Sequence, residues 1–153
     1  MLFVCTGNTC RSAIAEAVAR RGAAERGLLD LIVASAGTSA WDGAPASDGA
    51  LLVGIERRLD LAGHRSRPLS REMVEAAHVI LAMGPHHVAR IEALGGSGKT
   101  WLLSDYAERS SAGRAIVDPF GGGLDGYRTT ADEIERMVAA VLDRIAGERA
   151  DTA

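Results

Sequence analysis

The sequence predicts a single α/β domain of three layers, in which helices cover both faces of a four-stranded parallel sheet. Its length of 153 residues is close to that of one domain. Short apolar runs alternate along the chain with longer segments whose apolar residues recur at helical spacing. Continuous apolar runs are typical of parallel strands that are covered on both faces. We therefore expect residues 1–153 to form one domain, which ends in a disordered tail over about residues 148–153.

The first half of the chain is expected to contain two strands and three helices. Leu2–Val4 is apolar and precedes a loop, so it is the first predicted strand, and a helix over Ser12–Arg26 follows. Leu31–Ala34 is the second predicted strand. Helices are then expected over Ala46–Leu61 and over Ser70–Ala77, where the serine is suited to cap the helix.

The second half is expected to contain two strands and two helices. His78–Met83 is almost wholly apolar and predicts a buried strand, and Pro85–Leu94 begins with a proline suited to the first turn of a helix. Thr100–Leu103 is the fourth predicted strand, and a long polar loop is expected from there to Asp118. The last helix is predicted from one apolar stripe, formed by Ile134, Met137, Val138, Val141, Leu142 and Ile145.

The composition excludes several classes of protein. The chain is 47% hydrophobic and 24% charged, which argues against a disordered protein. Its 17 basic and 20 acidic residues give a net charge of −3, so no basic excess supports broad binding of nucleic acid. The apolar runs are much shorter than the roughly 20 residues of a membrane span. With two cysteines only, we expect a cytoplasmic protein with reduced thiols. Neither a long basic patch nor a coiled-coil repeat indicates an obligate partner, so we expect a monomer.

The loop after the first strand has the features of a phosphate cradle. Cys5 ends the strand, five residues intervene, and Arg11 opens the helix. Small residues let such a loop curl so that successive backbone N–H groups point inward, and a helix N-terminus adds further donors. The phosphate-binding residues are therefore predicted to be Thr6, Gly7, Asn8, Thr9, Cys10, Arg11 and Ser12.

Cys5 is predicted to be a nucleophile beneath the bound phosphoryl group. Arg11 can form a two-pronged contact with two phosphate oxygens, and the positive surroundings also favour thiolate over thiol. The alternative is that Cys5 is a small buried apolar residue, as cysteines at strand ends often are. The coincidence of strand, glycine-bearing loop and helix start favours the cradle.

The segment Val4–Ser12, followed by Ala15 and Glu16, resembles the low molecular weight protein-tyrosine-phosphatase family. The similarity extends over nearly the whole chain. Further motifs of that family are matched at Ser35–Thr38, Trp41 and Asp118–Phe120. One departure is Ala13, where many members have a proline, which would only stiffen the first turn of the helix.

The resemblance implies a two-step phosphatase that needs no cofactor. Cys5 would attack phosphorus, Arg11 and the loop amides would stabilise the developing charge, and Asp118 would act first as acid and then as base. Asn8, Ser12 and Ser35 resemble the residues that support the loop in this family. Trp41 and Phe120 resemble its aromatic wall. Phosphorylated proteins are the implied partners.

Thr9 bears on which phosphorylated side chain is attacked. Relatives that act on tyrosine usually carry a bulkier aliphatic residue at this position, and paired tyrosines after the proline. Thr9 and the segment Asp118–Gly122 instead resemble the bacterial protein-arginine-phosphatase branch. A threonine hydroxyl suits the N–H donors of phosphoarginine better than the apolar ring of phosphotyrosine. We expect phosphoarginine on proteins to be the substrate, with phosphotyrosine as the alternative.

Other functions are less well supported. Gly95–Thr100 ends like a nucleotide-binding loop, but the first glycine of that motif is replaced by Ala93 and a helix precedes the segment. Arsenate reductase chemistry needs cysteines beyond Cys10, and the chain has none there. The histidines lack the spacing of metal ligands, so no metal site is expected. A phosphate-binding module without catalysis would not need both Cys5 and Asp118.

The two cysteines suggest redox regulation. Cys5 and Cys10 lie in the same predicted loop, five positions apart. If the loop curls around one phosphate, their Cα atoms come within the roughly 4.4–6.8 Å that a disulfide requires. Cys10 is therefore expected to resolve an oxidised Cys5, and the alternative is that it only packs beneath the loop.

Overall fold

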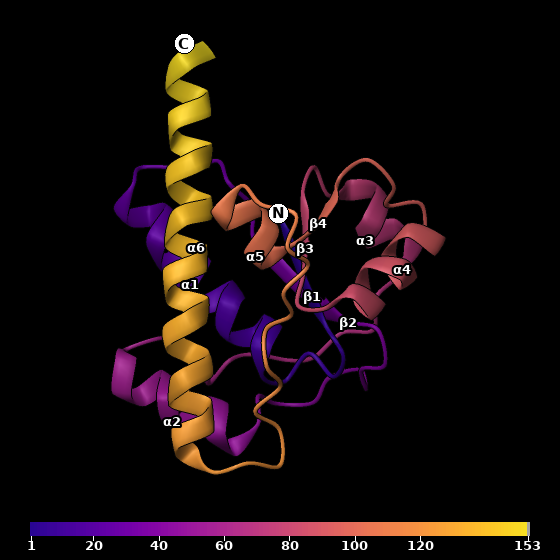
Figure 1. Cartoon of the computed structure of the whole chain (residues 1–153). Helices are drawn as coiled ribbons and strands as arrows, with labels where there is room; N and C mark the ends of the chain where they lie inside the picture. The colour runs from indigo at the N-terminus through magenta and orange to yellow at the C-terminus, as the bar shows by residue number, and fades with distance from the viewer. Residues whose placement is uncertain (153) are drawn as a thin grey trace.

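A computed structural model describes residues 1–152 of the chain (Figure 1). Its centre is a four-stranded parallel sheet in the order β2-β1-β3-β4. The strands are β1 (Leu2–Cys5), β2 (Ala34–Gly37), β3 (Ile80–Ala82) and β4 (Thr100–Leu102). The helices are α1 (Arg11–Glu25), α2 (Asp48–Arg57), α3 (Arg71–Ala76), α4 (Pro85–Ala93), α5 (Leu103–Glu108) and α6 (Leu124–Thr152). This is the predicted fold class.

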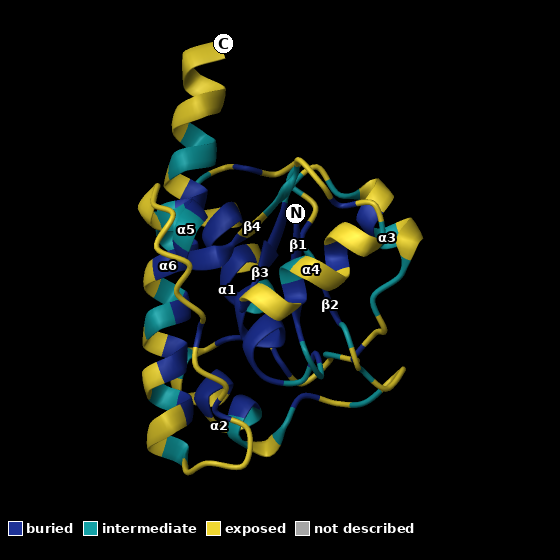
Figure 2. Cartoon of the chain, turned by 45° about the vertical axis from the view of Figure 1, so that its right-hand side comes forward, coloured by how far each residue is buried: buried dark blue, intermediate teal, exposed yellow. Residues whose placement is uncertain are grey.

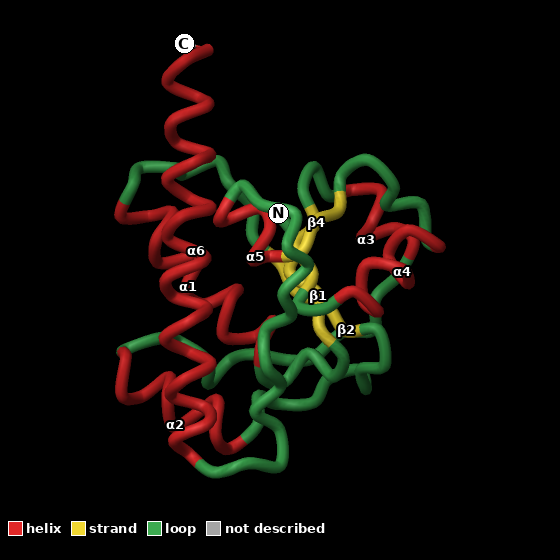
Figure 3. Tube along the Cα trace, in the orientation of Figure 1, coloured by secondary structure: helices red, strands yellow, loops and turns green. Residues whose placement is uncertain are grey.

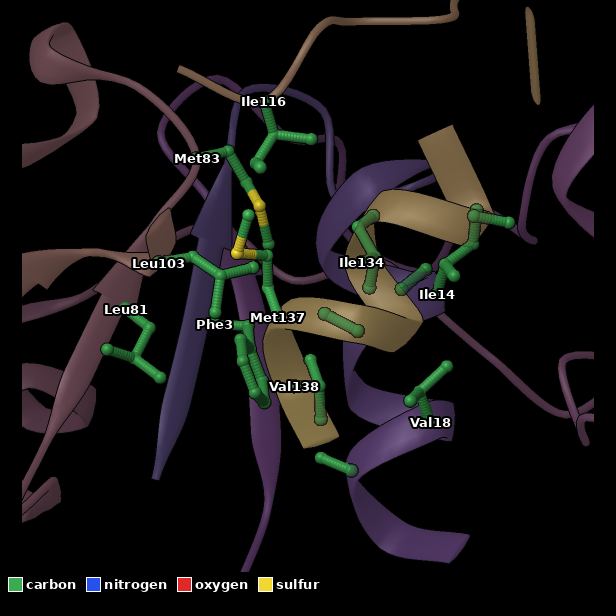
Figure 4. Close-up of a cluster of buried hydrophobic side chains, with 14 of the residues drawn as sticks. Phe3, Ile14, Val18, Leu81, Met83, Leu103, Ile116, Ile134, Met137 and Val138 are labelled. Carbon is green, nitrogen blue, oxygen red and sulfur yellow. The ribbon is translucent and has the colours of Figure 1, made fainter. Parts of the chain in front are cut away.

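Helices cover both faces of the sheet, so the side chains of the central strand β1 are buried on both sides. Phe3 belongs to the larger core, which α1 and α6 cover. Val4 belongs to a second core, with Val74 of α3 and Ile91 of α4. Figure 4 shows the larger core, where side chains from the sheet meet those of α1 and α6. Figure 2 shows that β1 and β3, at the centre of the sheet, are buried, while the outer faces of the helices are exposed.

The second strand lies later in the chain than predicted. The sequence favours Leu31–Ala34, but the structure pairs Ala34–Gly37 with β1. Ile32 is 81% exposed, so its apolar character does not reflect a place in the sheet. The end of β2 passes close to the phosphate-loop backbone, and a Cβ at Gly37 would collide with the Thr6 carbonyl. Small residues are required there, which is why the apolar pattern misplaces the strand.

A helix replaces the start of the predicted polar loop after β4. Leu103–Glu108 forms α5, whose first residue Leu103 is fully buried. Tyr106 packs toward α6, where the Arg144 guanidinium lies 3.9 Å from the centre of the Tyr106 ring. The helix is short, and contacts with α6 rather than its own sequence stabilise it.

The predicted disordered tail is wrong for residues 148–152, because α6 continues through them to Thr152. Two ion pairs support this last part of the helix. Arg144 lies 3.0 Å from Glu148, one turn away, and Arg149 lies 2.6 Å from Asp30. The final residue of the predicted tail, Ala153, lies outside the described residues. Among residues 1–152, no helix is both long enough and apolar enough to cross a membrane.

The topology places a crevice at the carboxyl ends of β1 and β3. The chain leaves β1 in one direction to form β2, while β3 pairs with the other side of β1. Ligands of open α/β sheets bind where the strand order reverses in this way. The loop between α5 and α6 passes the same edge (Figure 3), where Ile116 N donates to Met83 O at 2.8 Å. The loop after β1 and the segment before Asp118 therefore meet there.

Candidate active site

The loop between β1 and α1 is open to an anion at the start of the helix. Cys10 is the residue before α1, and among the described residues no side chain caps this helix. The first turn of α1 also contains no acidic residue. The first N–H groups of a helix lack acceptors within the helix, and the helix dipole makes this end positive. Phosphate is a ligand that such an end binds readily.

The Cys5 side chain lies at the base of this loop. The residue is 2% exposed, and its sulfur lies 2.8 Å from Ser12 Oγ. Asn8 Nδ2 donates to the same Ser12 oxygen at 2.8 Å, which leaves the hydroxyl hydrogen free to point at the sulfur. A hydrogen bond donated to sulfur favours its thiolate form.

Asn8 holds the loop in its curled shape. Its φ of 57° lies in the left-handed region, which asparagine tolerates better than most residues. Its buried side chain also donates to Ser35 Oγ at 2.9 Å and accepts from the Arg67 backbone N–H at 2.9 Å. Ser35 in turn donates to Glu16 at 3.0 Å. The three predicted supporting residues are thus joined in one buried hydrogen-bond network.

The Arg11 guanidinium faces the same crevice from the first turn of α1. It is 5% exposed, and its Nη1 donates to the Ile116 carbonyl at 3.1 Å. Its Nη2 lies 3.5 Å from Asp118 Oδ2. Its Nε is buried and has no hydrogen-bond partner among the described residues. The Nε and Nη2 atoms of an arginine have the geometry to bind two oxygens of one phosphate.

Asp118 lies at the mouth of the crevice, in the loop before α6. Its side chain is half exposed, so it remains open to solvent, and Oδ1 accepts the Phe120 N–H at 3.0 Å. The preceding segment is fixed by the buried Ile116 and by Thr130 of α6, which donates to Val117 O at 3.3 Å. The structure thus brings Asp118 to the guanidinium of Arg11, although the two residues are far apart in sequence.

Comparisons with known proteins agree with this geometry. The family model for low molecular weight phosphotyrosine protein phosphatase matches residues 1–151. The chain belongs to this family. A protein-arginine-phosphatase of Bacillus subtilis is 36% identical over 151 residues, which cover 97% of this chain and 98% of that protein. A low molecular weight protein-tyrosine-phosphatase of Streptomyces coelicolor is 32% identical over an alignment of 161 residues, which covers 97% of this chain and 96% of that protein.

A solved structure of a family member adds chemical detail. It is a cysteine-to-serine mutant of the arginine phosphatase YwlE, described as having a phosphorylated active-site serine. It matches this chain with a TM-score of 0.87 and 36% identity, covering 94% of this chain and 93% of that one. The resemblance inferred from the sequence is therefore confirmed at the level of the family.

The residues predicted to contact the substrate lie around the rim of the loop. Thr9 is half-buried, and its hydroxyl oxygen lies 3.8 Å from the Cys10 sulfur. Trp41 and Phe120 are 84% and 71% exposed, so both rings are available to a ligand. Their role as a wall remains a prediction.

Cys10 lies on the side of the loop that faces α2 and α6. Its sulfur is 3.1 Å from Ser47 Oγ and 3.4 Å from the Tyr127 hydroxyl. Burial, followed by the hydrogen bond with Cys10, raises the pKa of Tyr127 to about 12. Cys5 and Cys10 are both free thiols, each with its own polar neighbours.

Two histidines near the loop were not predicted as part of the site. His87 is fully buried, and its Nε2 lies 2.8 Å from Thr6 Oγ1. Burial, helped by the nearby charges of His86 and Arg11, lowers the pKa of His87 to about 4, so the ring is neutral near pH 7. His64 Nε2 lies 2.6 Å from Asn8 O. Sequence reasoning considered these residues only as metal ligands.

One signal in the sequence pointed to His87. It follows Pro85 at the start of the helix after β3, and the carboxyl end of β3 lies beside that of β1. Among residues 1–152, no group of three or more His, Cys, Asp or Glu side chains is arranged to hold a metal ion.

Proposed function

We propose that this protein is a phosphatase that hydrolyses phosphoarginine on proteins through a phosphocysteine intermediate at Cys5. The observation that carries the proposal is the set of donors around the Cys5 sulfur. These are the Ser12 hydroxyl at 2.8 Å, the open start of α1 and the buried fork of Arg11. A tetrahedral dianion above a thiolate is the ligand that this set of groups fits.

The first step transfers the phosphoryl group to the enzyme. The Cys5 thiolate attacks phosphorus and forms an S–P bond, while the P–N bond to the substrate arginine breaks. The electron pair of that bond goes to the leaving nitrogen, which takes a proton from Asp118. Arg11 and the loop amides stabilise the equatorial oxygens as charge develops.

Asp118 must be protonated for this step, although it faces Arg11 at 3.5 Å. A bound phosphate dianion neutralises the guanidinium and adds negative charge beside the carboxyl group. The bound substrate thereby replaces Asp118 as the partner of the Arg11 guanidinium, and the Asp118 carboxyl group is released to face the leaving nitrogen.

The second step releases phosphate. Water attacks phosphorus, and its proton passes to the Asp118 carboxylate. The S–P bond breaks, and its electron pair returns to Cys5 as thiolate, which the Ser12 hydroxyl stabilises. The phosphorylated active-site serine in the YwlE mutant supports a covalent intermediate of this kind.

Two features support phosphoarginine over phosphotyrosine as the substrate. Thr9 offers a hydroxyl whose only hydrogen-bond neighbour among the described residues is the weak acceptor Cys10 Sγ at 3.8 Å. Two curated relatives at 36% identity are named for arginine, whereas the curated relatives named for tyrosine match at 30–33%. One solved structure described as a tyrosine phosphatase of Bacillus subtilis also matches at 36%. Phosphotyrosine remains the alternative, because the loop itself binds only the phosphoryl group.

Matched peptides test the proposal. One peptide sequence is prepared with phosphoarginine and with phosphotyrosine, and phosphate release is measured for the wild type and for Cys5→Ser. We expect a higher kcat/KM for phosphoarginine, and no turnover by the variant despite retained phosphate binding. A preference for phosphotyrosine would establish the alternative. Substantial turnover by Cys5→Ser would contradict the covalent mechanism.

We further propose that the protein acts as a monomer in the cytoplasm on phosphorylated protein substrates. A catalytic thiol must remain reduced, and the cytoplasm keeps thiols reduced. Light scattering of the eluting protein should give about the chain mass of 16.0 kDa. A stable dimer in this measurement would contradict the proposed oligomeric state.

A further inference from the structure

A pocket of 370 Å³ lies beside the candidate active site, between the start of α2 and the start of α6. Leu52 of α2, Phe120 of the Asp118 loop and Leu124 of α6 form its apolar walls. Two of these side chains are unusually open for their size, since Leu52 is 48% exposed and Phe120 is 71% exposed. Exposed apolar groups on opposite sides of a hollow are typical of a surface that binds a ligand.

Two of the polar side chains that line the pocket, those of Ser47 and Tyr127, are already hydrogen-bonded within the protein. Ser47 Oγ interacts with Cys10 Sγ at 3.1 Å and with the Tyr127 hydroxyl at 3.2 Å. It also accepts the Ala50 N–H at 3.4 Å as the cap of α2. The Tyr127 hydroxyl shares the Cys10 sulfur. A ligand therefore gains little from polar contacts with these two residues, and the favourable occupant is apolar.

The charge at the edge of the pocket restricts the occupant further. Asp48 lines it from the first turn of α2 and is exposed. An acidic ligand group would be repelled by the Asp48 carboxylate, whereas an uncharged apolar group would not.

The walls of the pocket are hydrogen-bonded to the candidate active site. Ser47 N donates to Thr9 O at 2.9 Å, so the α2 side of the pocket is bonded to the phosphate loop. Phe120 N donates to Asp118 at 3.0 Å, so the opposite wall is bonded to the proposed acid. The backbone of a substrate protein that approaches from this side, with its phosphorylated side chain in the loop, would pass over this rim. Consecutive Cα atoms are about 3.8 Å apart, so residues close in sequence to the phosphorylated one lie within reach of the pocket.

We propose that this pocket is a subsite for the substrate chain, which takes a large apolar side chain close in sequence to the phosphorylated residue. The inference rests on the proposed phosphatase function. It adds a sequence preference to that function: apolar residues are favoured in the pocket and acidic residues are disfavoured. Leu52 and Phe120 would bind the side chain, and Asp48 would discriminate against carboxylates.

Phosphopeptides that differ at one flanking position test the proposal. Leucine, alanine or aspartate is placed in turn at each of the three positions on either side of the phosphorylated residue. Every peptide is made with phosphoarginine and with phosphotyrosine. Each kcat/KM is divided by the value that the same enzyme gives with p-nitrophenyl phosphate, so that changes in the chemical step cancel.

For the wild type, we expect at least one position at which leucine exceeds alanine by about 10-fold in this ratio, and aspartate falls below alanine. Leu52→Ala should remove most of the preference for leucine. Asp48→Asn should reduce the discrimination against aspartate and leave the preference for leucine in place. Ile55→Ala is the matched control, because Ile55 is 76% exposed on the same helix and does not line the pocket.

The outcomes separate this inference from the proposed function. If phosphopeptides are hydrolysed but leucine and alanine are equivalent at every position, the subsite is wrong and the phosphatase function stands. The same conclusion follows if the preference for leucine survives in Leu52→Ala. If no phosphopeptide of either kind is hydrolysed, the proposed function fails and the subsite fails with it.

Discussion

The Ser12 hydroxyl oxygen lies 2.8 Å from the Cys5 sulfur and also accepts a hydrogen bond from the side-chain amide of Asn8. The amide occupies one acceptor position of the hydroxyl, whose hydrogen is left free to point at the sulfur. Asn8 is held in turn by Ser35 and by the backbone of Arg67. The loop between β1 and α1, which is predicted to bind phosphate, therefore also directs a hydrogen-bonding group toward the Cys5 sulfur.

Ser12→Ala tests this relationship. Loss of a hydrogen bond to a charged group typically costs about 1.5–3 kcal/mol, so kcat should fall about 10- to 100-fold. The thiolate should also become less available, which slows alkylation of Cys5 by iodoacetamide at pH 6. This rate is measured in a Cys10→Ser background, so that one thiol reacts. Unchanged alkylation would mean that Ser12 does not stabilise the thiolate.

Asp118→Asn should affect substrates according to their leaving groups. An asparagine cannot supply a proton, and general acid catalysis typically contributes about 10²–10⁴-fold. The loss in kcat should be large for a phosphopeptide and small for p-nitrophenyl phosphate, whose leaving group needs little protonation. Asp125→Asn is the matched control, because its side chain is 97% exposed at the start of α6. Equal losses on both substrates would indicate that Asp118 only holds its loop in place.

Thr9→Ile is expected to move the preference from phosphoarginine toward phosphotyrosine. The isoleucine removes the hydroxyl and adds apolar bulk beside the phosphate, which disfavours a guanidinium and favours an aromatic ring. The ratio of kcat/KM for the two matched peptides should shift by about 10-fold or more. Thr129→Ile changes an exposed threonine on α6 and should leave the ratio unchanged. If Thr9→Ile also leaves it unchanged, Thr9 does not determine specificity.

The sequence was sufficient to predict the fold class and the strand–loop–helix unit that holds Cys5 and Arg11. That unit is local, so its residues are close both in sequence and in space. The second strand was misplaced because Ala34–Gly37 is small rather than markedly apolar. Its position follows from close packing against the phosphate-loop backbone, which a hydropathy pattern does not record. The α5 helix and the end of α6 were missed because contacts distant in sequence stabilise them.

The contacts of the histidines could not be predicted for the same reason. His87 reaches Thr6 across 81 positions of the sequence, and His64 reaches Asn8 across 56. Neither contact follows from a fixed spacing of residues in the sequence. The contact of His87 arises because parallel strands bring the loops at their carboxyl ends together. His64 lies in the connection between α2 and α3, which folds back against the loop after β1. The pairing of Arg11 with Asp118 is equally distant in sequence, and only the family resemblance suggested it beforehand.

His87 should make the folded state sensitive to acid. Its pKa is lowered to about 4 in the native protein, mainly by burial, compared with about 6.5 when unfolded. Between these values the unfolded chain binds a proton that the native chain does not, so stability falls as pH falls from about 6.5 toward 4. Above about pH 6.5, the neutral His87 does not reduce stability. By pH 5, its titration has lowered the free energy of unfolding by about 2 kcal/mol.

Denaturant unfolding at pH 7 and pH 5 measures this effect. His87→Gln removes the titrating group, so the variant should lose about 2 kcal/mol less than the wild type between these pH values. His78→Gln is the matched control, since it makes the same substitution at an exposed histidine. Parallel losses in the wild type and His87→Gln would show that His87 is not held neutral by its surroundings.

Cys10 is predicted to protect Cys5 from irreversible oxidation. Peroxide would oxidise the Cys5 thiolate to a sulfenic acid, its O–O bond breaking with release of hydroxide. The Cys10 thiol would then attack the Cys5 sulfur, forming an S–S bond and releasing water. To do so, the Cys10 sulfur must leave Ser47 and Tyr127, which it contacts at 3.1 Å and 3.4 Å. Those contacts also support the alternative in which Cys10 only packs beneath the loop.

Recovery after a peroxide pulse distinguishes these roles. Dithiothreitol reduces a disulfide or a sulfenic acid but not a sulfinic acid, so only the protected enzyme regains activity after prolonged exposure. The wild type should recover most of its activity, and Cys10→Ser should recover several-fold less. The intact mass before reduction should show loss of two hydrogens in the wild type and addition of oxygen in the variant. If both proteins recover equally, Cys10 does not form a disulfide with the oxidised Cys5. Its contacts with Ser47 and Tyr127 then serve packing only.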